Sequence, residues 1–262
     1  MKIGVIIPSR LAPRPRGREL RDFGPELWLD GAMASIINQR GYNANDWEIF
    51  VGVDPNVVVP LHIYDHATIV RGQVSGQASA VNEAVEIAIL EGCDVLMFLE
   101  DDDSWHRRKS EIMLPYLAQA PFLSCSQRLV GDDDPSSEKA AVLGINDFPA
   151  PSGWVMTVDL WKQVGGMNSS YRWMVDAEWL GRLNKLRVTR IHFKERGLPR
   201  TGKLGHVGLH STIVETDIPE FLVSRTVNSQ GGMVRVKKGG TPLAEAEAEV
   251  IKLRENFGNL PW

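Results

Sequence analysis

The stretch VLMFLEDDDSW, residues 95–105, decides the fold, because five apolar residues run without interruption into four carboxylates. A continuous apolar run of this length is typical of a strand buried on both faces, as in a parallel sheet covered by helices. Four adjacent carboxylates repel one another unless a cation lies among them. Oxygen ligands alone suit Mg²⁺ or Mn²⁺, which in turn bind phosphate. The alternative is a solvated acidic turn, the interpretation we give to residues 132–134, where no buried strand precedes.

Strand and helix patterns alternate before this stretch. Apolar runs predict strands at 3–7, 47–53 and 68–70, and helical spacing predicts helices at 26–40 and 78–90. This alternation predicts an α/β fold with a Rossmann-like, mostly parallel central sheet flanked by helices. Ligands of such sheets bind beyond the carboxyl ends of the strands. Pro8, Ser9, Asp54 and the acidic run at 100–103 all fall there.

The second half of the chain has a looser pattern. Helices are predicted at 110–117, 160–164, 176–186 and 243–257, and strands at 122–127, 154–158 and 188–193. Four glycines and a proline at 196–208 predict a loop or lid. We see no internal repeat and no low-complexity segment.

The composition excludes several classes of protein. The 262 residues carry 29 Lys and Arg against 33 Asp and Glu, a net charge of -4, so no overall basic field holds the chain on nucleic acid. Cys93 and Cys125 are too few for a disulfide framework, and we expect inert thiols in a reduced compartment. No apolar run approaches the ~20 residues of a membrane span. We expect a soluble, cytoplasmic protein.

A basic segment follows the first predicted strand. It has two prolines, and its arginines are Arg10, Arg14, Arg16, Arg18 and Arg21. Two interpretations stay open at this point: a solvated loop, or a clamp on phosphate or another anion.

Two nucleotide-binding motifs are disfavoured. Residues 197–203 match the glycines and lysine of a phosphate-binding loop, but Leu204 stands where a hydroxyl must reach Mg²⁺. The first predicted strand is not followed by the glycine pattern of a dinucleotide-binding fold.

Residues 99–105, with Lys109 and Glu111 after them, resemble the Asp-x-Asp region of family 2 glycosyltransferases of GT-A fold. That pattern reads roughly Leu-Asp-x-Asp-Asp-x-Trp, and Glu100 replaces its first Asp. Residues 6–10 look like the family's first strand and turn, and 48–54 like its second strand, whose terminal Asp reads the base. Residues 77–88 are similar to its Ala-Arg-Asn-x-Gly helix, except that Val81 replaces the Arg. The basic segment could supply that missing cation.

Three later motifs follow in the family's order. Residues 164–167 resemble its Gly-Gly-Phe segment, and 171–183 resemble its acceptor motif, with Val175 where an acid is common. The motif's central Asp maps to Asp176, the implied general base, with Glu178 in reserve. The alternative for Asp176 is a favourable charge at a helix N-terminus. Residues 206–211 look like a stretch of some N-acetylglucosaminyltransferases, which implies a metal ligand at His206, or else at His210.

The resemblance covers residues 3–211 and implies an inverting, metal-dependent glycosyltransferase that uses a nucleoside-diphosphate sugar, most often UDP-linked. It implies one GT-A domain at 1–215, with a nucleotide-sugar half at 1–103 and an acceptor half at 104–215, followed by a C-terminal extension at 216–262. The cofactor would be Mn²⁺ or Mg²⁺, held by Asp102, Asp103 and His206. The residues expected to bind the nucleotide sugar are Pro8, Ser9, Arg10, Asp54, Gln77, Glu100 and Asp101.

The acceptor stays open: a glycan, a lipid-linked precursor, a small molecule, a protein or a modified base in DNA, as in some viral systems. The DNA alternative rests on the basic segment together with Arg200, Lys203, Lys237 and Lys238. Two further alternatives are a sugar nucleotidyltransferase, disfavoured because residues 8–17 lack paired glycines, and a non-catalytic protein that binds nucleotide or glycan.

Overall fold

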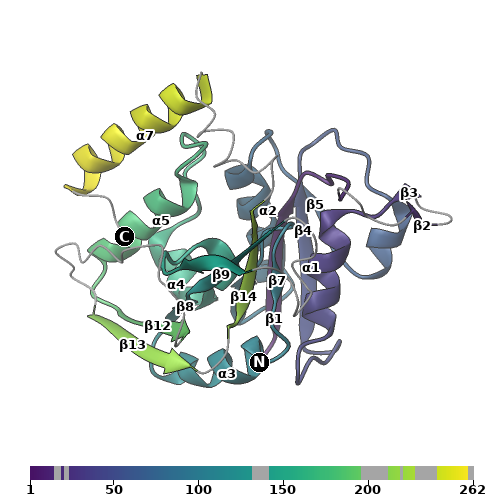
Figure 1. The fold of residues 1–262 in the computed structure, drawn as a ribbon, viewed down its shortest axis with the longest axis horizontal. Helices are drawn as coiled ribbons and strands as arrows, with labels where there is room; N and C mark the ends of the chain where they lie inside the picture. The colour runs from purple at the N-terminus through teal and green to yellow at the C-terminus, as the bar shows by residue number, and fades with distance from the viewer. Residues whose placement is uncertain are drawn as a thin grey trace.

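A mostly parallel sheet forms the centre of the protein (Figure 1). The computed structural model describes residues 1–14, 19–20, 24–131, 142–195, 212–218, 221–227 and 241–258. Within them the sheet has eight strands in the order β13-β12-β8-β11-β6-β1-β4-β5. All neighbours pair in parallel except β11, which is antiparallel to β6 and β8. The strands are β1 (Ile3–Ser9), β4 (Trp47–Val53), β5 (Thr68–Arg71), β6 (Val95–Phe98), β8 (Phe122–Cys125), β11 (Val155–Thr157), β12 (Thr189–Glu195) and β13 (Thr212–Ile218).

Helices cover both faces of this sheet, as the continuous apolar strands predict. Along β1, Val5 and Ile7 belong to one buried apolar cluster and Ile6 to the other. The first cluster includes α1, and the second includes α2, α4 and α5. The α/β fold class is therefore confirmed. The helices are α1 (Trp28–Ile37), α2 (Gln77–Leu90), α3 (Lys109–Met113), α4 (Val158–Val164), α5 (Val175–Lys185) and α7 (Thr241–Phe257), with 3₁₀ turns η1 (Leu61–Asp65), η2 (Leu114–Ala118) and η3 (Pro151–Gly153).

Helix α2 packs very close to the sheet at Gly52 of β4. A Cβ at this position would lie 2.2 Å from the backbone oxygen of Ala80 in α2. Only glycine allows this approach without moving the helix. The N-terminus of α2 is thereby held beside the carboxyl edge of the central strands.

A second sheet, absent from the sequence-based prediction, adjoins the acidic run. Its order is β10 (Val142–Asn146), β9 (Gln127–Gly131), β14 (Val223–Val227) and β7 (Ser104–Trp105). Because β7 directly follows the acidic run, its antiparallel pairing with β14 brings residues 223–227 to that run. The predicted boundary at residue 215 falls inside β13. A two-stranded ribbon of β2 (Glu19–Leu20) and β3 (Gly24–Pro25) lies near the start of the chain.

One strand prediction is wrong. Residues 122–127 do not form a single strand, because β8 ends at Cys125 and β9 begins at Gln127 in the other sheet. Ser126 lies between them, and its backbone N–H donates to the carbonyl of Phe193. Burial on both faces continues through this change of sheet, so the apolar pattern gave no sign of it.

Several residues singled out from the sequence lie outside the described residues: Arg16, Arg18, Arg21, Arg200, Lys203, His206, His210, Lys237, Lys238 and residues 132–134. None of the helices within the described ranges has the length and apolar character that a bilayer span requires.

Candidate active site

The acidic turn, defined here as Glu100–Asp103, is held in shape by Ser152 of η3. The Ser152 hydroxyl accepts from the Glu100 backbone N–H (2.9 Å) and donates to Asp103 Oδ2 (2.6 Å). The Ser152 carbonyl accepts from Trp105 Nε1 (2.9 Å) and from the buried Lys109 Nζ (3.0 Å). Ser152 therefore links the start and the end of the acidic turn to the residues that follow it.

The end of β1 contacts this turn directly. Ser9 Oγ donates to Asp101 Oδ2 (2.6 Å), and the Arg10 backbone N–H approaches the same oxygen (3.3 Å). Pro8 lies beside Gly52 in the register of β1 with β4. The structure thus brings Ser9 and Asp101 together, as their places at strand ends predict, and adds the backbone of Arg10 to them.

The N-terminus of α2 joins two further predicted residues to the edge of the sheet. Gln77 Nε2 donates to Glu100 Oε1 (3.3 Å), whereas Asp54 Oδ1 accepts from the Gly76 backbone N–H (2.9 Å). Gly76 has φ +133°, a conformation that favours glycine. Gln77 therefore contacts the acidic turn. Asp54, which follows β4, contacts the residue just before α2 instead.

Arg225 of β14 lies at the acidic turn, and no sequence pattern singled it out. Its Nη2 lies 3.6 Å from Glu100 Oε2, and the next residue, Thr226, donates its backbone N–H to Asp103 Oδ1 (3.0 Å). Burial acts to lower the pKa of Arg225, but the carboxylates around it, Glu100 first, raise it overall. Arg225 lies C-terminal to residues 3–211, which the family resemblance covers. Its position beside the acidic turn is seen only in the structure, where β14 pairs with β7.

The acidic turn carries more negative charge than Arg225 offsets. Burial, and then Asp103 and Asp101, raise the pKa of Asp102 well above its ordinary value. Burial and Glu100 raise the pKa of Asp103 to about 7 despite its hydrogen bonds from Ser152 and Thr226. The pKa of Asp101 is also raised by burial, against the effect of its hydrogen bond from Ser9. The turn therefore favours any ligand that brings positive charge.

Asp176 lies in the first turn of α5, within electrostatic range of the acidic turn. Burial raises its pKa to about 6, the charge of Glu100 adds to this rise, and Arg225 opposes it. Its Oδ1 accepts from the Ala177 backbone N–H (2.8 Å). A carboxyl group with this pKa is largely ionised at neutral pH and is still basic enough to take a proton.

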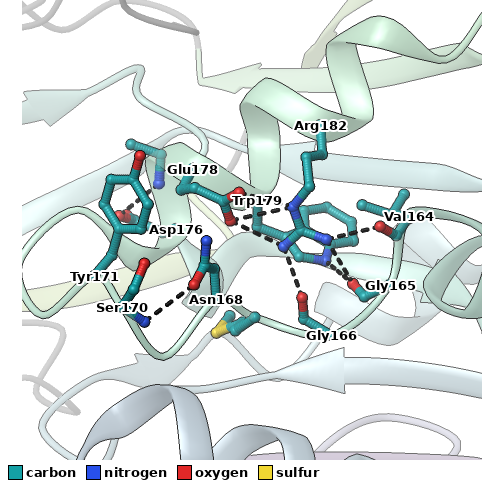
Figure 2. A network of polar contacts seen from close by, with 12 residues as sticks. Val164, Gly165, Gly166, Asn168, Ser170, Tyr171, Asp176, Glu178, Trp179 and Arg182 are labelled. Carbon is teal, nitrogen blue, oxygen red and sulfur yellow. Dashed lines mark hydrogen bonds and ion pairs between the residues drawn. The ribbon is translucent and has the colours of Figure 1, made fainter. Parts of the chain in front are cut away.

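Glu178, the reserve candidate for the base, is held in a different contact. It is 5% exposed, and its Oε2 lies 2.9 Å from Arg182 Nη2. Arg182 also donates to the carbonyls of Val164 (2.7 Å) and Gly166 (2.6 Å). Figure 2 shows the Glu178 carboxylate turned toward Arg182, whose guanidinium reaches the 164–166 segment. The contacts of Glu178 thus support the glycine segment rather than the acidic turn.

The glycine segment is also held from α2. Asn82 Oδ1 accepts from the Met167 backbone N–H (2.7 Å), and Asn82 Nδ2 donates to the Met167 carbonyl (2.8 Å). A Cβ on Gly166 would lie 2.8 Å from Asn82 Oδ1, and Gly165 has φ +86°. The two family motifs at 77–88 and 164–167 therefore meet in space.

We predict that Arg182→Ala destabilises the protein by about 3 kcal/mol, because Glu178 would stay buried without its ion-pair partner. Denaturant unfolding measures this change. Arg187→Ala removes an exposed arginine two residues beyond α5 and serves as the control, with an expected change below about 0.5 kcal/mol. Equal stability of the two variants would contradict the prediction.

One arginine of the basic segment faces the acidic turn. A small pocket has Arg14, Trp28 and Asp102 in its lining. Arg14 pairs with Glu26 (3.1 Å), and its guanidinium lies 5.3 Å from the centre of the Trp28 ring. Arg14 therefore lies near the acidic turn, and the choice between a solvated loop and a clamp on an anion stays open for the basic segment.

A ready-made metal site is not present within the described residues, where no three His, Cys, Asp or Glu side chains form a group that could hold an ion. His206, the predicted third ligand, lies outside those residues. Asp103 is 2% exposed, and both of its oxygens accept hydrogen bonds from the protein.

No protein-family model and no curated protein matches this sequence. Solved structures do resemble it. The mannosyltransferase PcManGT from Pyrobaculum calidifontis, in complex with GDP-Man and Mn²⁺, has 13% identity and a TM-score of 0.57 over 96% of this chain and 64% of its own. TarS residues 1–349 from S. aureus, in complex with UDP-GlcNAc, has 10% identity and a TM-score of 0.54 over 89% of this chain and 61% of its own.

The chain has the GT-A fold. At these identities the likeness shows the fold alone. The chain also spans less than two thirds of each structure, and only 37% of the longer S. aureus TarS structure. In this GT-A fold, the acidic turn, Ser9 and Gln77 lie at the carboxyl edge of the parallel strands, where open α/β sheets bind their ligands.

Proposed function

We propose that the protein is a glycosyltransferase that moves a sugar from a nucleoside-diphosphate sugar to an acceptor hydroxyl, with inversion and with the help of a divalent metal ion. The observation that carries this proposal is the acidic turn, with Arg225 and Asp176 in its field, at the carboxyl edge of a GT-A sheet. Two structures of the same fold support the donor class, since TarS binds UDP-GlcNAc and PcManGT binds GDP-Man with Mn²⁺.

The oxygen chemistry of the acidic turn is of the kind that a divalent metal ion binds, although the described residues alone do not form a complete site. Mn²⁺ and Mg²⁺ accept carboxylate oxygens, and burial, followed by repulsion between neighbouring carboxylates, raises the pKa values of Asp102 and Asp103. We assign the ion to Asp102 and His206, and we assign Asp103 mainly to the support of the turn, because its oxygens accept from Ser152 and Thr226. The bound ion would neutralise the leaving diphosphate as a Lewis acid.

The nucleoside half of the donor would lie along the ends of β1 and β4 and the start of α2. Ser9, Arg10 and Asp101 form one wall of this region, with Asp54 and Gln77 on the α2 side. Position 81 lacks the cation that the family pattern places there. We assign the compensating charge to Arg225 and Arg14, since both lie beside the acidic turn.

Asp176 would act as the general base. Above a pH of about 6 its carboxylate is ionised and can take the proton of the acceptor hydroxyl as the oxygen attacks the anomeric carbon. Inversion follows when this attack comes from the face opposite the diphosphate. Glu178 is assigned to the support of the glycine segment through Arg182.

A thermal-shift panel of nucleotide sugars, with and without Mn²⁺, tests the proposal. We expect one donor at about 100 times its Kd, with Mn²⁺, to add about 2.7 kcal/mol of stability. This corresponds to a rise in Tm of about 5–10 °C for a chain of this size. The controls are Mn²⁺ alone and each donor with a chelator. A panel in which no donor raises the Tm would reject the proposal, and donor hydrolysis followed by NMR would separate an enzyme from a binding protein.

A further inference from the structure

The C-terminal helix α7 packs on α5, which carries Asp176 (Figure 1). Ala246 and Leu253 of α7 are buried, at 2% and 0% exposed. Phe257 lies so close to Gly181 of α5 that a Cβ there would be 2.6 Å from its ring, and Lys185 Nζ lies 4.7 Å from the centre of the same ring. The two helices therefore form one packed unit, although the sequence suggested a separate extension.

Glu249 of α7 binds the backbone that leads into α5. Its carboxylate accepts from the N–H groups of Arg172 (2.7 Å), Trp173 (2.9 Å) and Met174 (2.9 Å). Met174 is the N-cap residue of α5, and its own side chain makes no capping hydrogen bond. The N–H groups at a helix start need acceptors, and a charged acceptor forms the stronger hydrogen bonds. A residue 75 positions along the chain thus accepts from the N-cap residue and from the two residues that lead into the helix.

A second acid on the same helix strengthens this contact. Glu245 Oε2 accepts from Trp173 Nε1 (2.9 Å) and lies 3.6 Å from Arg172 Nη1. Residues 172–174 are therefore held through both backbone and side chains. Asp176 follows two residues after Met174, so the path of this segment sets where its carboxylate lies.

We infer that Glu249 is a positioning residue for Asp176, and that α7 belongs to the acceptor side of the active site. The inference rests on the proposed function, in which Asp176 is the base. A misplacement of about 1 Å at a reacting group can reduce the rate about 10²-fold. Loss of Glu249 leaves three backbone donors without their common acceptor, and the 172–176 segment then adopts a wider range of positions.

A residue that only stabilised the fold would behave differently. The residues assigned to the donor lie in β1, at the end of β4, in α2 and in the acidic turn, and none of them contacts Glu249 within the described ranges. Loss of Glu249 should therefore lower kcat and leave the KM for the donor unchanged. A purely structural cap would lower Tm without changing the turnover of the folded protein.

The experiment compares Glu249→Ala, Glu249→Gln and the control Glu247→Ala, which removes an exposed acid from the same helix. We expect kcat of Glu249→Ala to fall about 10²-fold with the donor KM within about twofold. The Gln variant keeps one amide oxygen as an acceptor and should recover part of the loss, whereas Glu247→Ala should match the parent protein. Wild-type kcat for Glu249→Ala, measured below its Tm, would overturn the inference.

Two measurements on the donor-free protein keep this inference separate from the proposed function. Amide hydrogen exchange at residues 172–174 and a ¹³C titration of the Asp176 carboxyl should both change in Glu249→Ala and not in Glu247→Ala. If both change while the parent protein transfers no sugar, the proposed function fails and the positioning contact stands. If neither changes, the inference fails whatever activity the protein has.

Discussion

Asp102→Ala is expected to abolish metal-dependent donor binding. Burial and three neighbouring carboxylates raise the pKa of Asp102 well above its ordinary value. A bound cation would offset this repulsion, so we place the cation at Asp102. Removal of a residue that only supports a metal ligand typically lowers metal affinity about 10–100-fold. We expect Asp102→Ala to lower the metal-dependent affinity for the donor by more than this. Calorimetry of UDP or the best donor of the thermal panel, with and without Mn²⁺, measures it.

The matched control is Asp159→Ala, which removes an exposed carboxylate from α4. Removal of Asp102 relieves repulsion among crowded acids and also removes a charge that attracts Arg225, so the unfolding temperature of Asp102→Ala is measured beside that of the metal-free parent. Lost binding can then be separated from lost folding. Unchanged binding of UDP with Mn²⁺ by Asp102→Ala would place the metal on another carboxylate.

Asp176→Asn is expected to bind donor normally and to lose transfer. The amide cannot take a proton from the acceptor, and loss of a general base typically reduces kcat about 10²–10⁴-fold. In the parent protein, kcat should rise with pH through about 6, because Asp176 must be deprotonated to act. Initial rates from pH 5 to 8 at saturating donor measure this limb of the profile.

The comparison of Asp176→Asn with Glu178→Gln separates the two acids. Glu178→Gln removes the ion pair with Arg182 and leaves at most a hydrogen bond to the amide oxygen, so stability should fall more than kcat. The residual kcat of Asp176→Asn should no longer rise with pH through about 6, because the group that titrates there is absent. Near-normal turnover by Asp176→Asn would move the base to another residue.

Local pattern was enough to predict most strands of the central sheet, although it missed β13 and carried β8 on into β9. Continuous apolar strands such as Ile3–Ser9 and Val95–Phe98 are buried on both faces, and the helices between them have clear apolar spacing. Because the strand ends meet at one edge, Ser9, Asp54 and the acidic turn were predicted to lie there, whereas Gln77 was expected there only from the family resemblance.

Residues that act through distant contacts could not be predicted in this way. Arg225 reaches Glu100 only because a two-residue strand, β7, pairs with β14, and strands this short carry no periodic signal. The contact of Asp103 with Ser152 joins residues 49 positions apart. Glu178 is different, since Arg182 stands four residues later on the same helix, and that spacing was a signal for a structural ion pair.

The pairing of β7 with β14 also bears on the order in which the molecule assembles. Asp103 and Thr226 are 123 positions apart, so the acidic turn gains its backbone donor and the cation of Arg225 only after β14 has emerged from the ribosome. Closing so long a loop costs entropy that earlier contacts must already have offset. The acidic turn therefore cannot complete its native contacts before β14 is available, and a nascent chain that ends before β14 carries these carboxylates without this partner.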